Sequence, residues 1–339
     1  MSLFLDNGFV NMPRLFASRL PFVFVVGGRG TGKTYGALEY VRKQALDGKK
    51  FIYMRRTQDQ VDKISQEDFS PFKSIDELTG TITTVQKMAG KTFSFVDAST
   101  DQILGYCFAL STFAKMRGFD ASDVATLIFD EFIPEKHERA IKNEAEAFFN
   151  AVETINRNRE LTGGEPLQCV LLSNANNMGN PLFLELGLVS RATKMLAKGV
   201  DTYRDEKRGL MLVIIQNSPI SEAKKQTALY KLTIGSSFQK MAIDNDFNEQ
   251  CSNLRHAPLK ELRPLVGVGE ITIYTHKSEN WLYVSTHRTG SPPTFGSSSI
   301  AELNRFRLQY MWVWEAYMMR RVYFEEYLCE LLLSKYLRA

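Results

Sequence analysis

A glycine-rich segment with one lysine carries the clearest chemistry in this sequence. Residues 27–34 read GGRGTGKT and match the phosphate-loop pattern G-x-x-x-x-G-K-[ST], after an apolar run and before a helix-compatible stretch. Backbone N–H groups of such a loop surround a phosphate at the positive end of the next helix. A glycine-rich turn without a ligand is the alternative. We expect a nucleoside triphosphate to bind here, through Gly27, Gly28, Arg29, Gly30, Thr31, Gly32, Lys33 and Thr34.

Two adjacent carboxylates follow a second apolar run. Residues 124–131 read VATLIFDE, which predicts a buried strand that ends at Asp130 and Glu131. We expect Asp130 to bind Mg²⁺ together with Thr34, and Lys33 to meet the β- and γ-phosphates of ATP. Glu131 is placed to polarise an attacking water. Passive binding or a kinase reaction does not need the second carboxylate, so the pair favours ATP hydrolysis.

Basic residues lie between these two motifs. The short strand expected at 51–54 is followed by Arg55 and Arg56, which can sense phosphate, contact a neighbouring subunit or form a solvated turn. The basic loop 115–118 contains Lys115, which can reach another subunit's nucleotide or remain an exposed charge. The residues alone leave these alternatives open.

Further candidate residues follow the carboxylate pair. Apolar spacing predicts an amphipathic helix within 143–160, which closes on Arg157 and Arg159. An arginine there can neutralise γ-phosphate charge in the next subunit of a ring, or compensate the helix dipole. Asn174 ends the strand expected at 169–175, where its amide can orient the lytic water or simply form a turn.

The elements that must position these residues alternate between strands and helices. This order predicts an α/β fold, a P-loop NTPase core with a mainly parallel sheet of at least five strands. The apolar runs expected as strands are 21–26, 51–54, 124–131, 169–175 and 210–215. We expect a hairpin insertion before Asp130, from strands at 81–85, 92–96 and 106–110.

The ordered motifs resemble one protein family. GGRGTGKT, FIYMRR, LIFDEF, NRNRE and LLSNA, within residues 20–215, are similar to motifs of the DNA-packaging ATPases, or encapsidation proteins, of small tailed phages with protein-primed genomes. That family has an additional strand and a catalytic glutamate, and is related to terminases and pumping translocases. The resemblance places the trans-acting arginine finger on Arg157 and a donated basic residue on Lys115. Gln58 departs from a lysine found in another member.

The resemblance also implies partners. It implies a homo-oligomeric ring, a pentamer, that moves double-stranded DNA without sequence preference through a portal into an empty procapsid, in some members with a structural RNA. A generic DNA translocase or helicase would use the same motifs. A non-motor nucleotide-binding adaptor or a kinase is the competitor from another class.

The composition of the chain indicates which partners and which cellular location to expect. The net charge of +4 is only mildly basic, which argues against a nucleic-acid coat. No apolar stretch approaches the length of a transmembrane helix, so we expect a host-cytoplasmic protein that is transiently at the portal vertex of the procapsid, with no membrane partner. The 4 cysteines are scattered and are expected to be reduced, and the 4 histidines lack metal-ligand spacing.

Composition changes after residue 216. We expect a P-loop ATPase domain at 1–216, a helical linker at 217–252 and a small C-terminal α/β docking domain at 253–339. The linker is expected to hold one helix beginning after Ser221 and another around 237–242. The last domain has two alternating strands at 270–274 and 281–285 and helices to its end. It contains no Asp, so nuclease activity is not expected; the resemblance suggests a nuclease-dead ribonuclease-H-like fold.

Overall fold

The computed structural model describes residues 2–66, 69–88, 90–116, 118–135, 138–236, 239 and 253–338, without the side chains of Lys115 and Met116. The chain forms two compact units. The first contains residues 1–185 and 195–248, and the second contains residues 186–194 and 249–339. Each unit has its own sheet. No helix in the described ranges is long and apolar enough to cross a membrane.

The first unit is built on a large sheet, in which the described residues form nine strands in the order β3-β4-β5-β2-β6-β7-β1-β9-β8. Six neighbouring strands of this sheet are parallel to one another, in the order β5, β2, β6, β7, β1 and β9. The remaining pairs, β3–β4, β4–β5 and β8–β9, are antiparallel. Their bounds are β1 Phe22–Gly27, β2 Lys50–Arg55, β3 Thr83–Lys87, β4 Phe93–Asp97, β5 Ile103–Ala109, β6 Val124–Asp130, β7 Gln168–Ser173, β8 Thr202–Asp205 and β9 Leu210–Ile215.

Strand order decides where the sequence motifs meet. β7 lies between β1, which leads into the phosphate loop, and β6, which ends in the carboxylate pair. Because all three strands are parallel, their carboxyl ends share one edge of the sheet. The expected α/β fold with a mainly parallel sheet is confirmed. The three strands expected as a hairpin insertion before Asp130 do pair antiparallel, β3 with β4 and β4 with β5, and they also extend the large sheet, because β5 pairs in parallel with β2.

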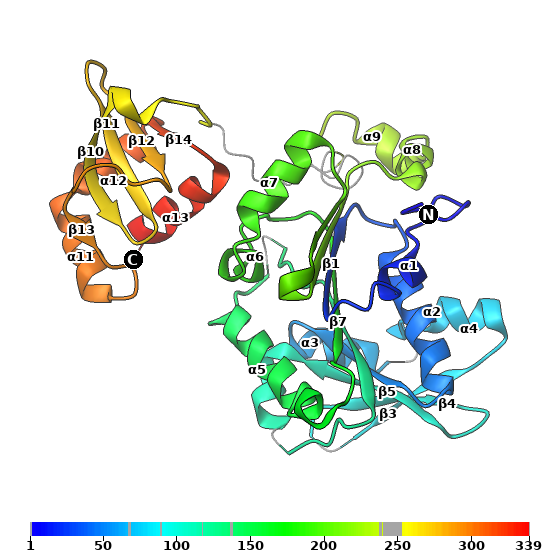
Figure 1. Ribbon diagram of the computed structural model, residues 1–339. Helices are drawn as coiled ribbons and strands as arrows, with labels where there is room; N and C mark the ends of the chain where they lie inside the picture. Colours follow the sequence, from blue (N-terminus) through cyan, green and yellow to red (C-terminus); the bar gives the residue numbers. More distant parts are fainter. Residues whose placement is uncertain are drawn as a thin grey trace. The chain divides into compact units, whose positions relative to one another are not determined.

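Helices cover both faces of the large sheet (Figure 1). Val23 and Val25 of β1 pack on the face covered by α1 to α4. Phe24 points to the other face, where it contacts Phe132 and Phe183. A strand buried on both sides needs apolar residues at every position, which explains the uninterrupted run in β1. The helix bounds are α1 Met12–Phe16, α2 Lys33–Leu46, α3 Gln58–Ile64, α4 Lys73–Thr79, α5 Glu144–Asn156, α6 Pro181–Glu185, α7 Val189–Lys198, α8 Pro219–Lys225 and α9 Ala228–Leu232.

A buried charge network ties the end of β2 to α5. The Arg56 side chain is fully buried, and its Nε and Nη2 atoms donate to the Glu144 carboxylate at 2.6 and 2.9 Å. Its Nη1 atom donates to Glu138 at 2.7 Å. Arg56 is therefore a structural ion-pair residue, and the solvated basic turn considered from sequence is wrong for this position.

Replacing Arg56 by Met should destabilise the first unit. The change leaves the Glu144 carboxylate buried without its partner, so we expect the free energy of unfolding to fall by about 3 kcal/mol or more. Urea unfolding followed by circular dichroism measures this loss. Lys43→Met, which breaks an exposed pair with Glu39, is the matched control and should cost about 0.5 kcal/mol at most.

The second unit is a smaller α/β domain, as expected. Its described strands form a sheet in the order β13-β10-β11-β12-β14, and α11, α12 and α13 supply side chains to its core. The chain was expected to be helical after residue 296, but Tyr323 and Phe324 lie in β14, which pairs with β12. The bounds are β10 Leu262–Val268, β11 Ile271–His276, β12 Leu282–Ser285, β13 Thr294–Phe295, β14 Val322–Phe324, α11 Ile300–Gln309, α12 Met311–Met318 and α13 Tyr327–Leu337.

The segment after β9 also differs in detail from the expectation. Ser218, and not Ser221, precedes the first helix, because Pro219 occupies its first turn. The expected single helix is divided into α8 and α9. The second linker helix, expected around 237–242, lies outside the described residues. Cys107, Cys169 and Cys329 are buried free thiols, as expected of reduced core residues, and Cys251 lies outside the described residues.

Candidate active site

The phosphate loop joins β1 to α2 and holds its own lysine. Gly32 precedes α2 with φ 85°, a left-handed conformation that glycine adopts without strain. The Lys33 Nζ atom donates to the carbonyl oxygens of Gly27 and Gly28 at 3.0 and 2.7 Å. Burial lowers the pKa of Lys33 to about 8, although the nearby Asp130 opposes this change. The loop therefore encloses a cation at the N-terminus of a helix, an arrangement suited to phosphate.

The residues expected to hold a divalent cation meet across the sheet edge. The Thr34 Oγ1 atom lies 3.2 Å from both carboxylate oxygens of Asp130. Asp130 is buried, and its Oδ2 atom accepts a hydrogen bond from the Tyr53 hydroxyl at 2.7 Å. A hydroxyl and a carboxylate are the hard oxygen ligands that Mg²⁺ prefers, so these residues fit that ion. Tyr53 is a supporting residue that the sequence analysis did not identify.

Glu131 is held by an arginine from the neighbouring part of the sheet. The Arg55 Nη2 atom forms an ion pair with Glu131, and its Nη1 atom lies 3.4 Å from Asp130. Burial raises the pKa of Glu131, and Arg55 acts in the opposite direction. Glu131 also has φ 56°, which is uncommon outside glycine and concentrates at functional sites. Arg55 is mostly buried and is not part of a solvated turn.

A pocket of about 210 Å³ lies at the carboxyl ends of the parallel strands. The pocket brings together phosphate-loop residues, the carboxylate pair and the end of β7. Its lining is Gly30, Thr31, Gly32, Lys33, Thr34, Tyr35, Asp130, Glu131, Ser173 and Asn174. Asn174 thus lies at the candidate site, where it was predicted. Arg29 is directed elsewhere, because its guanidinium forms an ion pair with Glu135.

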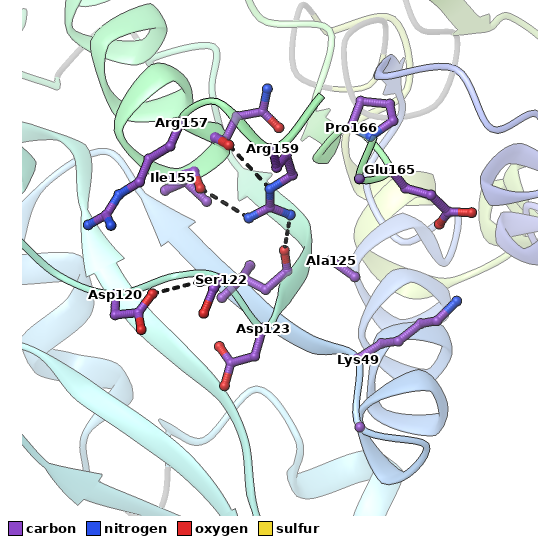
Figure 2. A pocket seen from close by; sticks show the side chains of 14 residues that line it. Lys49, Asp120, Ser122, Asp123, Ala125, Ile155, Arg157, Arg159, Glu165 and Pro166 are labelled. Atoms are coloured by element: carbon purple, nitrogen blue, oxygen red, sulfur yellow. Dashed lines mark hydrogen bonds between the residues drawn. The ribbon is translucent and has the colours of Figure 1, made fainter. Parts of the chain in front are cut away.

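The two candidate arginines after α5 have different environments. Arg159 donates to the main-chain oxygens of Val124, Ala121 and Ile155 at 2.7, 2.9 and 3.1 Å. Arg157 is exposed, and its Nη2 atom donates to the Phe119 carbonyl oxygen at 2.7 Å. Figure 2 shows both beside a second pocket of about 420 Å³, with the Arg157 guanidinium pointing away from Arg159. Arg159 anchors the chain, so Arg157 is the better candidate for a finger.

This second pocket lies far from the first. It is lined by Val124 at the start of β6, whereas Asp130 ends the same strand. At about 3.3 Å per residue, the strand separates the two edges by roughly 20 Å. Arg157 therefore does not join the other predicted residues within this chain.

Two further sequence positions have clear outcomes. Gln58 is nearly buried and bonds to Asp62, the Lys91 carbonyl oxygen and Thr112. These contacts give it a structural role in α3. The Lys115 side chain lies outside the described part of the chain, so its predicted role is untested.

Comparison with known proteins places the chain in a family. Residues 6–262 match the model of the podovirus DNA encapsidation protein, Gp16. The chain belongs to the podovirus DNA encapsidation protein family. The predicted resemblance is thus confirmed, and the shared region of this encapsidation family contains the phosphate loop, the carboxylate pair and α8.

Two phage DNA packaging proteins are similar in sequence to this chain. The DNA packaging proteins of Bacillus phage PZA and Bacillus phage phi29 are each 30% identical to this chain over 228 residues. The match covers 66% of this chain and 61% of each relative, so the chain aligns with less than two thirds of their length.

Solved structures of packaging motors share the fold. A chain of the bacteriophage Phi-29 viral genome packaging motor assembly has a TM-score of 0.68 at 19% identity, and the match covers 98% of this chain and 100% of that chain. A chain of the Phi-28 gp11 DNA packaging motor has a TM-score of 0.63 at 20% identity, with 98% of both chains covered. At these identities the likeness establishes the fold alone.

Proposed function

We propose that this protein is an ATP-hydrolysing motor subunit that moves double-stranded DNA through a portal into an empty procapsid. The observation that carries the proposal is the geometry around Asp130, where Thr34, Tyr53 and Arg55 converge beside Glu131. A site that only holds nucleotide has no use for a second carboxylate at this edge. Membership in the DNA encapsidation family supports the proposal that ATP hydrolysis moves DNA into the procapsid.

The residues divide the work of nucleotide binding. Lys33 and the backbone of Gly30 to Thr34 bind the phosphates of ATP, and Thr34 and Asp130 hold Mg²⁺. An ion held there would supply positive charge against the charge that develops on the phosphates. Tyr53 fixes the orientation of the Asp130 carboxylate through its hydroxyl, and Asn174 lies at the same pocket to contact the γ-phosphate or the water.

Glu131 positions and polarises the attacking water. In this structure the Glu131 Oε2 atom accepts a hydrogen bond from Arg55, and a carboxylate has further acceptor positions that can bind the attacking water. Arg55 stays near through its contacts with Tyr53 and Asp130.

The site is completed by a neighbouring subunit. Arg157 lies at the opposite edge of the sheet from its own phosphate loop, so it serves the nucleotide of the next subunit in a homo-oligomeric ring, a pentamer by family resemblance. Lys115 is proposed as a second basic residue donated across that interface. An exposed guanidinium that reaches γ-phosphate stabilises the charge of the transition state.

The rest of the chain is assigned by the same reasoning. We propose an ATPase domain at 1–216, a linker at 217–252 and a docking domain at 253–339, without nuclease activity. The docking domain has no Asp, and its described residues contain no group of three or more Asp, Glu, Cys or His side chains that could hold a metal ion. DNA is held through its phosphates, without sequence preference, in the host cytoplasm at the portal vertex. A structural RNA is a further partner implied by the resemblance.

Steady-state ATP hydrolysis tests this function. The rate is measured with no addition, with double-stranded DNA, and with DNA plus empty procapsids that carry their portal. Strong stimulation that needs both additions supports the packaging motor. Equal stimulation by naked DNA points to a general translocase, and indifference to both removes the motor assignment.

Tyr53→Phe tests the magnesium assignment. The change removes one hydroxyl from a buried ring and leaves Asp130 with one hydrogen-bond donor fewer. Loss of such a supporting contact weakens metal affinity, so we expect the Mg²⁺ concentration for half-maximal hydrolysis to rise about 10-fold. Tyr106→Phe, in β5, is the matched control and should leave the Mg²⁺ requirement unchanged. Equal Mg²⁺ titrations for both variants would contradict the assignment.

A further inference from the structure

A lysine from a distant part of the chain bonds to the phosphate loop. Lys224, in α8, donates from Nζ to the Arg29 carbonyl oxygen at 2.5 Å. The same Nζ atom lies 2.1 Å from the position that a Cβ atom of Gly30 would take. Any side chain at residue 30 would therefore displace the ammonium group, so the glycine lets α8 reach the loop.

The charge environment of Lys224 is unusual. No carboxylate among the described residues forms an ion pair with it, whereas its neighbour Lys225 pairs with Glu222 at 2.8 Å. The Lys224 ammonium instead contacts the Arg29 carbonyl and faces the ring of Tyr230 at 5.9 Å. It lies close enough to Lys33 to contribute to the lowered pKa of that residue. Several cations are thus gathered at one loop, and an anion bound there would offset their repulsion.

We propose that Lys224 is a ligand of the bound triphosphate, and that its ammonium moves from the Arg29 carbonyl to a phosphate oxygen when ATP binds. This inference rests on the proposed binding of ATP to the phosphate loop. A flexible four-carbon side chain can make this short move without any change in the fold of α8. A bond from the ammonium to a charged phosphate oxygen, in which both partners are ionised, is stronger than the present bond to a neutral carbonyl.

Lys224 lies near the end of the first unit in the sequence. α8 follows β9 and precedes α9, after which the chain continues toward the second unit. A phosphate that holds Lys224 therefore fixes a segment near the end of the first unit, before the chain enters the second. Nucleotide occupancy is communicated to that segment through one side chain, and loss of phosphate releases it to the carbonyl.

The test compares Lys224→Met with Lys224→Arg and with Lys225→Met in the full chain. Titration with a fluorescent ATP analogue and Mg²⁺ gives the dissociation constant. We expect Lys224→Met to weaken binding about 10-fold, Lys224→Arg to retain most of the affinity, and Lys225→Met to match wild type. Hydrogen–deuterium exchange of residues 219–232 gives a second readout. ATP should slow exchange there in wild type and in Lys225→Met, but not in Lys224→Met.

The outcomes separate this inference from the proposed function. If wild type hydrolyses ATP while Lys224→Met and Lys225→Met bind ATP equally and show equal protection, Lys224 is not a phosphate ligand and the ATPase assignment stands. If binding depends on Lys224 but wild type never hydrolyses ATP, the inference stands and the motor assignment fails. A lower unfolding temperature of Lys224→Met and Lys224→Arg without nucleotide would show a structural role and overturn the inference. Absence of ATP binding by wild type would overturn both.

Discussion

Glu131→Gln should bind ATP and fail to hydrolyse it, with kcat reduced by about 10²- to 10⁴-fold. Gln keeps the size of the side chain and can still accept a hydrogen bond from Arg55. We therefore expect the backbone conformation at residue 131, with its φ of 56°, to stay the same. What Gln lacks is a basic oxygen for the proton of the attacking water. Single-turnover hydrolysis and titration with a fluorescent ATP analogue measure the two effects separately.

The matched control for this change is Glu146→Gln. Glu146 is exposed in the first turn of α5, so removal of its charge should leave kcat within about 3-fold of wild type. Unaltered turnover by Glu131→Gln would mean that another group activates water. Loss of ATP binding would mean that Glu131 shapes the pocket and does not act on the water.

Arg157→Ala should reduce hydrolysis by about 10³-fold and should do so dominantly in mixed assemblies. The residue lies at the opposite end of the strands from its own phosphate loop, and β6 spans roughly 20 Å between these ends. In the proposed ring, the lost charge therefore belongs to the site of a neighbour. One variant subunit then disables a wild-type subunit beside it. Hydrolysis measured against the fraction of variant protein should therefore fall more steeply than that fraction rises.

Two controls accompany the mixing experiment. Arg204→Ala removes an exposed arginine from β8, the last strand in the order of the large sheet, and should leave hydrolysis unchanged. Arg159→Ala should lower stability, because it removes the main-chain contacts that anchor the end of α5. A loss of activity that is strictly proportional to the fraction of Arg157→Ala would show that Arg157 does not act in trans.

The parts of the site that the sequence predicted are those written in consecutive residues. The phosphate loop and the Asp130–Glu131 pair are local patterns, because their chemistry depends on one strand end and the turn after it. β9 was predicted with its observed bounds, since an apolar run of this kind is typical of a strand buried on both faces. The sequence therefore predicted the α/β class and the edge at which the pocket lies.

The residues that the sequence did not identify act through contacts between distant segments. Tyr53 occupies a strand where any large apolar residue would satisfy the pattern, and only the register of β2 against β6 brings its hydroxyl to Asp130. Lys224 lies in a polar helix whose local sequence is that of a solvated surface. Arg55 was noticed, but its ion pair with Glu131 depends on the same strand register.

Strand β6 joins the two functional regions of the first unit. β6 begins at Val124, whose carbonyl oxygen anchors the turn that carries Arg157, and ends at Asp130, next to Glu131. In a ring assembled as we propose, every subunit contacts its two neighbours through different surfaces. A change at one subunit's nucleotide then displaces the arginine that it lends to the next subunit, but not to the previous one. Such a ring has an inherent sense of rotation, and successive hydrolysis events would follow one another around it in one fixed order.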